Sequence, residues 1–339
     1  MMFQKILISR TDAIGDLILT LPMVDVIKQK LPDAKVFILG ENYNKPIVQS
    51  APLVDGFIDW SELKNQTEKN IIEKLKEQNF DVIINVFPNK KIAIASKKAK
   101  IPIRIGTSHR YYHWLNCNRI INLSRKNSEL HEAQLNIMLL KKLNISTEFT
   151  LNDIKKIGRI KPFAELPDEI NLLINKSSNR KIILHPKSKG SAKNWNIINF
   201  VKLAEMLSNN NFDVFITGTE TESNLIKSEL GYNKIPHTID LMNKLNLSEL
   251  ITFISKCDCL VAASTGPLHI ASALNVNVIG LYPPIRPMHP ARWQPIGTKV
   301  DVLCADKKCS ICRNDTNCKC MQEILPQQIL KIILDKIIY

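Results

Sequence analysis

Short runs of apolar residues alternate with longer amphipathic runs along most of this sequence. In the first half the short runs cover residues 5–9, 35–40 and 81–87, with amphipathic runs at 16–31 and 67–78 between them. Strands that are apolar on both faces belong in a parallel sheet, whose connections are usually helices. The first half is therefore predicted to be a doubly wound α/β domain.

The same alternation occurs a second time. A helix predicted at 129–143 closes the first half, and the polar stretch 146–178 is predicted to be a connector. Beyond it we predict strands at 181–185, 213–217, 258–263 and 277–282, helices at 196–208, 247–256 and 267–274, and a final amphipathic helix at 327–338. This organisation predicts two domains, 1–160 and 161–339, facing a cleft with the ligand at the carboxyl ends of the strands.

The chain has an excess of positive charge, which indicates an anionic partner. Its 339 residues include 46 Lys and Arg against 32 Asp and Glu, a formal net charge of +14. The stretch 82–128 contains no Asp or Glu, interleaves Tyr111, Tyr112 and Trp114, and holds ten of the basic residues: Lys90, Lys91, Lys97, Lys98, Lys100, Arg104, Arg110, Arg119, Arg125 and Lys126. It is either a solvated face or an acceptor-side surface for an anionic glycolipid at the cytoplasmic leaflet. No standard nucleic-acid motif accompanies the charge, so nucleic acid is not an expected partner.

No targeting segment is evident, and this affects how the cysteines are interpreted. The N-terminal apolar run is broken at Arg10, and no apolar run reaches the ~20 residues that cross a bilayer. We expect a cytoplasmic protein with reduced thiols, and ordinary buried thiols at Cys117, Cys257 and Cys259. The Cys-rich loop 304–320 contains a C-x₂-C-x₅-C-x-C pattern that could hold a structural zinc ion or simply carry free thiols or a labile disulfide: Cys309, Cys312, Cys318 and Cys320.

The turn after the first strand is the first candidate site. Gly15 lets the backbone approach a ligand, and Asp16 follows it in the first turn of the expected helix. Asp16 is either a first-turn acid favoured by the helix dipole or a general base, with Arg10 beside it to bind an anionic group.

Three further turns follow strands of the second half. Residues 185–195 place Lys187, Ser188, Lys189 and Lys193 where they could neutralise a diphosphate, unless they form only a solvated loop, and Trp195 is predicted to be a packing anchor. Ser264, Thr265 and Gly266 precede a proline suited to a helix start, an arrangement that binds anions, and His269 is either a phosphate donor or a buried, satisfied histidine. Glu222 suits ribose hydroxyls or a helix cap.

Taken in order, these segments resemble glycosyltransferase family 9, the heptosyltransferases that build the lipopolysaccharide core. The matching segments cover nearly the whole chain: ISRTDAIGDLILTLP, RIGT, HPKSKGSAKNW, ITGTETE, STGPLHIASAL and RPMHPARWQPIG. The resemblance implies a GT-B architecture of two Rossmann-like domains, with the acceptor bound by the N-terminal one and the nucleotide-sugar by the C-terminal one. It also implies inversion at the anomeric carbon with no catalytic metal.

By position, the resemblance makes Asp16 the general base and Lys193 the lysine that meets the donor phosphates. Heptosyltransferases commonly have Asp where this chain has Ser264. The resemblance also places a basic residue at Arg10, a ribose-binding acid at Glu222 and the phosphate-binding helix turn at Thr265, Gly266 and His269. Together with these we predict Gly15, Arg104 and Arg110 to bind the acceptor and Ser188 and Ser264 to bind the donor.

The expected function is transfer of a heptose-like sugar from an ADP-heptose type of donor to a lipopolysaccharide core or related glycolipid. The protein is then cytoplasmic and in transient contact with the inner membrane surface. Two alternatives stay open: a nucleotide-sugar 2-epimerase-like enzyme and a non-catalytic sugar-nucleotide binder.

Overall fold

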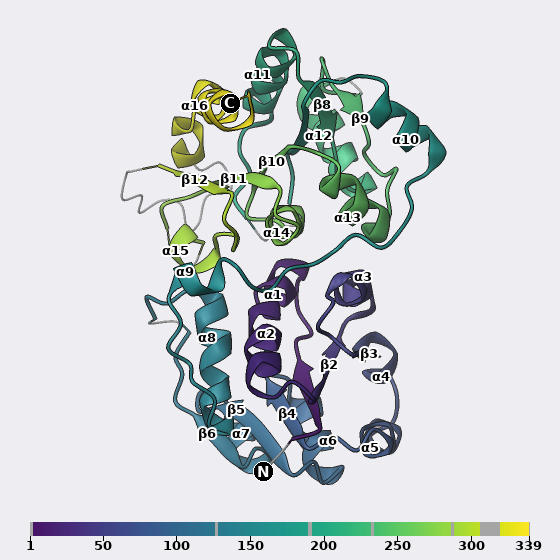
Figure 1. Cartoon of the computed structure of the whole chain (residues 1–339), viewed down its shortest axis with the longest axis vertical. Helices are drawn as coiled ribbons and strands as arrows, with labels where there is room; N and C mark the ends of the chain where they lie inside the picture. Colours follow the sequence, from purple (N-terminus) through teal and green to yellow (C-terminus); the bar gives the residue numbers. More distant parts are fainter. Residues whose placement is uncertain are drawn as a thin grey trace. The chain divides into compact units, whose positions relative to one another are not determined.

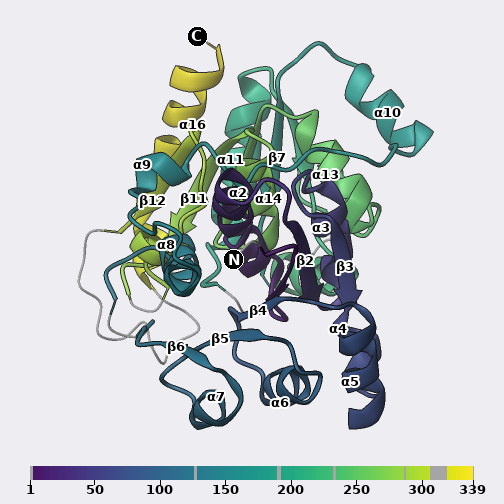
Figure 2. The same cartoon turned by 60° about the horizontal axis from the view of Figure 1, so that its bottom comes forward.

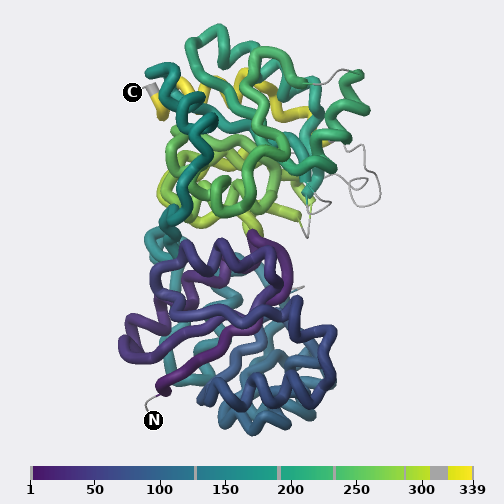
Figure 3. The backbone as a smooth tube through the Cα atoms, turned by 90° about the vertical axis from the view of Figure 1, so that its right-hand side faces the viewer, coloured from purple at the N-terminus to yellow at the C-terminus, as the bar shows by residue number. Residues whose placement is uncertain are grey.

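The computed structural model describes residues 3–125, 128–188, 192–231, 234–285, 288–305 and 319–338. The chain divides into two compact units, Met1–Lys161 (unit 1) and Pro162–Tyr339 (unit 2). Figure 3 shows the chain completing unit 1 before it begins unit 2. No helix in the described ranges combines the length and apolar character needed to span a bilayer.

Unit 1 is built on a parallel sheet (Figure 1). Its order in the described part is β3-β2-β1-β4-β5-β6, the strand order of the Rossmann fold. Ile6, Leu7 and Ile8 are all fully buried, so both faces of the sheet are covered. The strands are β1 (Lys5–Ser9), β2 (Lys35–Gly40), β3 (Gly56–Asp59), β4 (Val82–Asn85), β5 (Ile103–Thr107) and β6 (Arg119–Ile121).

Two predicted helices of unit 1 have other bounds than expected, and the helices at Lys45–Ser50, Trp60–Leu63, Lys90–Lys98 and Tyr111–Asn116 were not predicted. The single helix expected at 16–31 is two helices, because Pro22 in the second position of α2 cannot continue the hydrogen bonding of a helix that began earlier. The helix expected at 129–143 ends at Met138 and continues as a 3₁₀ turn, Leu139–Leu143. The helices are α1 (Ile14–Ile18), α2 (Leu21–Lys30), α3 (Lys45–Ser50), α4 (Trp60–Leu63), α5 (Glu68–Glu77), α6 (Lys90–Lys98), α7 (Tyr111–Asn116), α8 (Glu132–Met138) and α9 (Leu151–Ile154), with a 3₁₀ turn at Asn42–Asn44.

Unit 2 repeats the same strand order. Its described sheet runs β12-β11-β10-β7-β8-β9 and is parallel throughout. The strands are β7 (Lys181–His185), β8 (Asp213–Ile216), β9 (Ile239–Asp240), β10 (Cys259–Ala263), β11 (Asn277–Tyr282) and β12 (Val300–Cys304). The helices are α10 (Asp168–Asn175), α11 (Ile197–Asn209), α12 (Glu220–Leu230), α13 (Leu247–Ser255), α14 (Gly266–Ala273), α15 (Pro290–Trp293) and α16 (Pro326–Ile333), with a 3₁₀ turn at Lys319–Glu323 and a π-helical turn at Leu334–Ile338.

The predicted connector 146–178 contains the boundary between the two units, but it also holds two helices that the prediction missed. Thr150 and Asp153 form a capping box that starts α9, and two acids in the first turn favour α10. Several strands also escaped prediction, namely β3, β5, β6, β9 and β12. β3, β6 and β9 are very short, and β5, β6 and β12 carry a charged residue, so none shows an uninterrupted apolar run.

In both sheets the order in which strands are added reverses between the first and the fourth strand of the unit. In unit 1 this point lies between β1 and β4, where Ser9 pairs in register with Asn85. In unit 2 it lies between β7 and β10, where His185 is opposite Ala262. Ligands of open α/β sheets bind outside the carboxyl ends of the strands at such points. The fold therefore directs attention to the segments that follow these four strands.

Trp195 is the packing anchor that the sequence predicted. It is 1% exposed and packs edge to face on Phe200, with 4.8 Å between ring centroids. Its Nε1 donates to the carbonyl of Ile324 at 2.9 Å, which ties the loop after β7 to the C-terminal segment. That segment lies against α11, since Ile329 and Ile333 share one core cluster with Trp195.

Replacing Trp195 should destabilise unit 2 in two steps. Trp195→Phe keeps a ring but leaves the buried carbonyl of Ile324 unpaired, at a cost of about 1–3 kcal/mol. Trp195→Ala also opens a cavity and should cost about 3–5 kcal/mol. Urea unfolding measures both, and the exposed Trp114→Phe is the control, with an expected change near zero. Equal stability of all four proteins would contradict the anchoring role.

Candidate functional site

A buried arginine organises the turn after β1. The Arg10 side chain is 3% exposed and contacts three carboxylates. Its Nε lies 2.7 Å from Asp12 Oδ1, its Nη2 donates to Asp16 Oδ1, and its Nη1 donates to Glu132 Oε1 at 3.3 Å. The guanidinium is thus surrounded by carboxylates of its own unit and lies beside Asp16, a geometry that supports a positioning role for Arg10. The acceptor contact of Arg10 stays a prediction.

Glu132 and Arg125 complete this cluster from far along the chain. Arg125 Nε donates to Glu132 Oε1 at 2.9 Å, and its Nη2 donates to Asn136 Oδ1 at 2.8 Å. Asn136 in turn donates to the carbonyl of Leu19, so α8 is tied to the junction of α1 and α2, which it flanks in Figure 1. Sequence reasoning missed Glu132 as a site residue, because an acid in a first helical turn gives no local sign of a distant arginine.

Burial makes the carboxylates of this cluster more basic than ordinary ones. It raises the pKa of Asp16, the negative charge of Glu132 adds to the rise, and Arg10 opposes it. Burial raises the pKa of Asp12 to about 7, again against Arg10 and with Asp16 adding to the rise. Asp16 nevertheless keeps 21% of its side chain exposed. It is therefore a carboxylate fixed in direction, open to solvent and raised in pKa, as a general base requires.

The other residues predicted to bind the acceptor lie at different points along the strands of unit 1. Gly15 lies in α1 beside Asp16, and Arg110 is exposed at the start of α7, after the carboxyl end of β5. Arg104 pairs in register with Ile83, nearer the amino end of the sheet. Its Nε donates to the carbonyl of Asn116 at 2.7 Å, so this guanidinium caps the end of α7. Arg104 is the second residue of β5, three residues before the carboxyl end of that strand, and its acceptor contact stays a prediction.

The turn from β10 into α14 contains a buried hydroxyl that lacks a partner. Thr265 is the N-cap of α14 with extended backbone, it is 5% exposed, and its Oγ1 makes no hydrogen bond within the described residues. Gly266 is the first residue of the helix, and the buried His269 lies in the next turn. An unfilled hydroxyl beside the free N–H groups of a helix start suits an anionic ligand.

Ser264 lies beside the neighbouring strand. It lies near the hydroxyl of the fully buried Tyr282 on β11, and this hydroxyl donates to the carbonyl of Trp293 at 2.9 Å. Burial raises the pKa of Tyr282, so the phenol stays neutral. Ser264 is thus a neutral hydroxyl beside the buried phenol of Tyr282 in unit 2.

Some side chains of the loop after β7 are paired with other residues of unit 2. Lys187 is buried and its Nζ contacts Glu229 Oε2 of α12 at 2.5 Å, so it is not a solvated loop lysine. Ser188 is buried with its Oγ 3.1 Å from both the carbonyl of Ala192 and Asn194 Oδ1. Lys193 is half-buried in the same loop, and Lys189 lies outside the described residues.

Glu222 forms the helix cap that was the alternative to a ribose contact. Its Oε2 accepts from the backbone N–H of Thr219 at 2.7 Å, and Thr219 Oγ1 accepts from the N–H of Glu222 at 3.4 Å. The buried His185 at the end of β7 lies 3.1 Å from Thr217 Oγ1. Burial lowers the pKa of His185 and the charge of Glu222 opposes this. The ribose contact stays a prediction.

The cysteine prediction can be followed only in part. Cys309, Cys312 and Cys318 lie outside the described residues, and Cys320 is buried. Within the described ranges, no three His, Cys, Asp or Glu side chains are grouped to hold a metal ion. Cys117, Cys257 and Cys259 are buried free thiols, as predicted, and burial raises the pKa of Cys117 to about 11.

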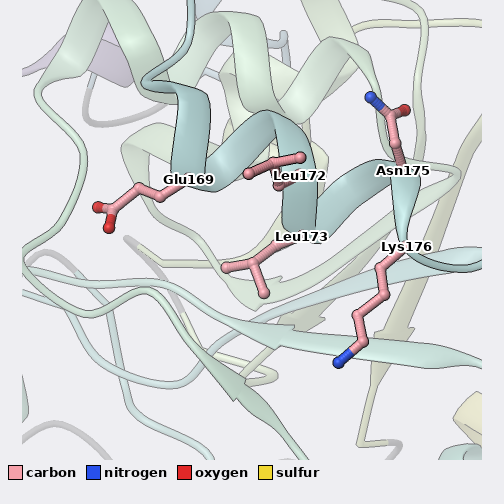
Figure 4. Close-up of a pocket in the computed structure, with 5 residues that line it drawn as sticks. All are labelled: Glu169, Leu172, Leu173, Asn175 and Lys176. Atoms are coloured by element: carbon pink, nitrogen blue, oxygen red, sulfur yellow. The ribbon is translucent and has the colours of Figure 1, made fainter.

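A hollow beside α10 lies apart from the turns after β1 and β10 in its lining residues. Figure 4 shows the side chains that line it, all from α10 and the residue after it: Glu169, Leu172, Leu173, Asn175 and Lys176. None of the predicted site residues is among them, so we assign it no role in the chemistry.

Comparison with known proteins gives one consistent result. Lipooligosaccharide heptosyltransferase 2 of Haemophilus influenzae is 24% identical over 88% of each chain. A family 9 glycosyl transferase of Veillonella parvula superposes with a TM-score of 0.78 at 19% identity, covering 99% of this chain and 98% of that one. The Escherichia coli ADP-heptose lps heptosyltransferase II gives a TM-score of 0.75 at 19% identity over 98% of each chain.

The fold of both solved proteins is therefore that of this chain, two Rossmann-like units of the GT-B type. Residues 69–321, more than half of the chain, match glycosyltransferase family 9 (heptosyltransferase). The protein belongs to glycosyltransferase family 9, the heptosyltransferase family, and is a glycosyltransferase.

Proposed function

We propose that this protein is an inverting heptosyltransferase that uses an ADP-heptose type of donor and a lipopolysaccharide-core type of acceptor. The observation that carries the proposal is Asp16, a partly exposed carboxylate of raised pKa held by the buried Arg10 at the carboxyl end of β1. The names of the relatives supply the sugar: one is a lipooligosaccharide heptosyltransferase, and a structural neighbour is an ADP-heptose enzyme.

The proposed reaction is a single displacement. Asp16 takes the proton of an acceptor hydroxyl while that oxygen forms a bond to the anomeric carbon. The bond from the anomeric carbon to the diphosphate oxygen breaks, and its electron pair leaves with the nucleoside diphosphate. Attack from the face opposite the leaving group inverts the anomeric centre.

Unit 2 supplies groups suited to the leaving diphosphate. Negative charge grows on this group in the transition state, so donors placed there accelerate the reaction. Thr265 Oγ1, the free N–H groups at the start of α14 and the Lys193 ammonium are the proposed donors. Since these groups are cationic or polar N–H and O–H donors, the proposed transfer requires no metal.

The proposed acceptor is an anionic glycolipid at the inner face of the cytoplasmic membrane. The acid-free segment 82–128 supports this, because it concentrates positive charge in unit 1, the same unit as Asp16. The test of the whole proposal is a transfer assay with ADP-heptose and truncated core glycolipids, with the product anomer read by NMR. A retained anomeric configuration, or no transfer of heptose, would overturn it.

Asp16→Asn should slow transfer by about 10²- to 10⁴-fold, because positioned proton transfer is lost while the side chain keeps its shape. Binding of ADP, measured by calorimetry, should not change. Asp55→Asn, a similar change elsewhere in unit 1, is the control and should retain turnover. Near wild-type turnover of Asp16→Asn would remove Asp16 from the mechanism.

Glu132→Gln should move the acidic limb of the kcat/KM profile to lower pH. In the wild type a raised pKa of Asp16 means that activity rises with pH through a value above that of an ordinary aspartate. The Glu132 charge contributes to that rise, so removing it lowers the pKa of Asp16 and keeps the base ionised in more acidic solution. Glu77→Gln, on an exposed face, should leave the limb in place. A limb that does not move would show that Glu132 has no effect on the base.

Thr265→Val should weaken ADP binding without destabilising the protein. The buried hydroxyl has no partner in the described structure, so a methyl group in its place costs nothing in folding, while a hydrogen bond to a charged phosphate is lost. The expected loss in affinity is about tenfold or more. Thr219→Val is the contrast: its hydroxyl caps α12, and its loss should cost about 1 kcal/mol in urea unfolding. If Thr265→Val binds ADP normally, this hydroxyl does not face the diphosphate.

A further inference from the structure

Helix α7 exposes an apolar face that the proposed chemistry does not use. Tyr111, Trp114 and Leu115 are 66%, 62% and 65% exposed, and their spacing of three and four places them on one side of the helix. In the described residues no other helix exposes three large apolar side chains. Contiguous exposed apolar surface of this kind marks an interaction site.

The opposite side of α7 is fixed to the sheet. The buried His113 and Cys117 lie so close to Gly106 of β5 that a Cβ there would approach both to 2.8 Å. Thr107 donates its backbone N–H to His113 Nδ1 at 3.0 Å. The exposed face therefore cannot turn inward, and it is presented by a rigid element.

Two of the exposed side chains, Trp114 and Tyr111, have contacts of their own, and the backbone of Leu115 is held by α6. Trp114 Nε1 donates to the carbonyl of Ser108 at 2.8 Å, which fixes the indole against the loop before the helix. Lys97 Nζ donates to the carbonyl of Leu115 at 2.7 Å, and Lys90 Nζ lies 5.7 Å from the centre of the Tyr111 ring. Both lysines come from α6, which lies beside α7 in Figure 2. Less ordering is lost on binding when side chains are already fixed.

The segment that carries this face has charge of one sign, and the nearest ion pair printed for α6 joins Lys98 to Glu68 of α5. Residues 82–128 contain no Asp or Glu, and Lys90, Lys97 and Arg110 lie in or next to the contacts just described. Tyr and Trp favour the interface between water and lipid, where one end of the ring is wet and the other apolar. Lysines beside them attract anionic headgroups.

We propose that α7 docks on an anionic phospholipid bilayer, with Tyr111, Trp114 and Leu115 entering the interface and the lysines of α6 meeting the headgroups. The inference does not rest on the proposed transfer reaction, since it concerns a surface formed without donor or acceptor. In this proposal the three exposed side chains of α7 make the contact between unit 1 and a membrane surface.

The test is cosedimentation of the full chain with vesicles that contain no glycolipid. Phosphatidylglycerol vesicles should bind the protein, phosphatidylcholine vesicles should not, and added salt should weaken binding. The double variant Tyr111→Ser/Leu115→Ser should lose about tenfold or more in affinity, because two side chains no longer leave water. The matched control Leu172→Ser/Leu225→Ser removes two exposed apolar side chains of unit 2 and should bind like the wild type.

Trp114 provides a second readout. Trp60 and Trp195 are buried and Trp293 is half-buried in unit 2, so a blue shift of tryptophan emission on adding anionic vesicles is assigned to Trp114 by its loss in Trp114→Phe, which still binds. Absence of binding to anionic vesicles, or binding that the Tyr111/Leu115 variant does not weaken, overturns the proposal. Concentration-dependent self-association that this variant abolishes, measured by sedimentation equilibrium, would also overturn it by assigning the face to a second copy.

Discussion

A guanidinium removed from water must replace its lost hydration with hydrogen bonds and opposite charge, and Arg10 does so with Asp12, Asp16 and Glu132. Two of these acids follow β1 directly, whereas Glu132 comes from α8, 122 residues away. Burial of one side chain therefore fixes the end of β1, the start of α1 and the first turn of α8 to one another. Asp16 gains its direction from this arrangement.

The same burial sets the chemistry of the cluster. Three carboxylates gathered around Arg10 and Arg125 repel one another and lose water, and both effects raise the pKa of Asp12 and Asp16. An exposed aspartate at a helix start would be a weaker base. Arg10 opposes this rise for Asp16 and fixes the direction of its carboxylate, so the pKa of Asp16 reflects burial and the charge of Glu132 acting against the ion pair.

Two threonines of unit 2 occupy the same position in their helices but differ in their hydrogen bonds. Thr219 and Thr265 are both N-caps of helices that follow strands of the same sheet. Thr219 bonds its own helix through Glu222, while Thr265 is buried with no such bond in the described chain. A cap that is filled stabilises its helix, and one that is empty leaves a polar group for a ligand. The two threonines therefore have separable effects on stability and on binding.

The local pattern of the sequence predicts the class of fold and the turns that hold the candidate site residues. Apolar runs at β1, β2, β7 and β11 are long enough to identify their strands by pattern, and the helix starts after β1 and β10 follow from local rules. What the tertiary structure decided is which side chains meet. Three contacts between distant segments show this. Arg10 pairs with Glu132, Lys187 pairs with Glu229, and Arg104 donates to the carbonyl of Asn116. Local pattern reports which residues face a core, whereas pairing of buried charges is set by how separate elements pack.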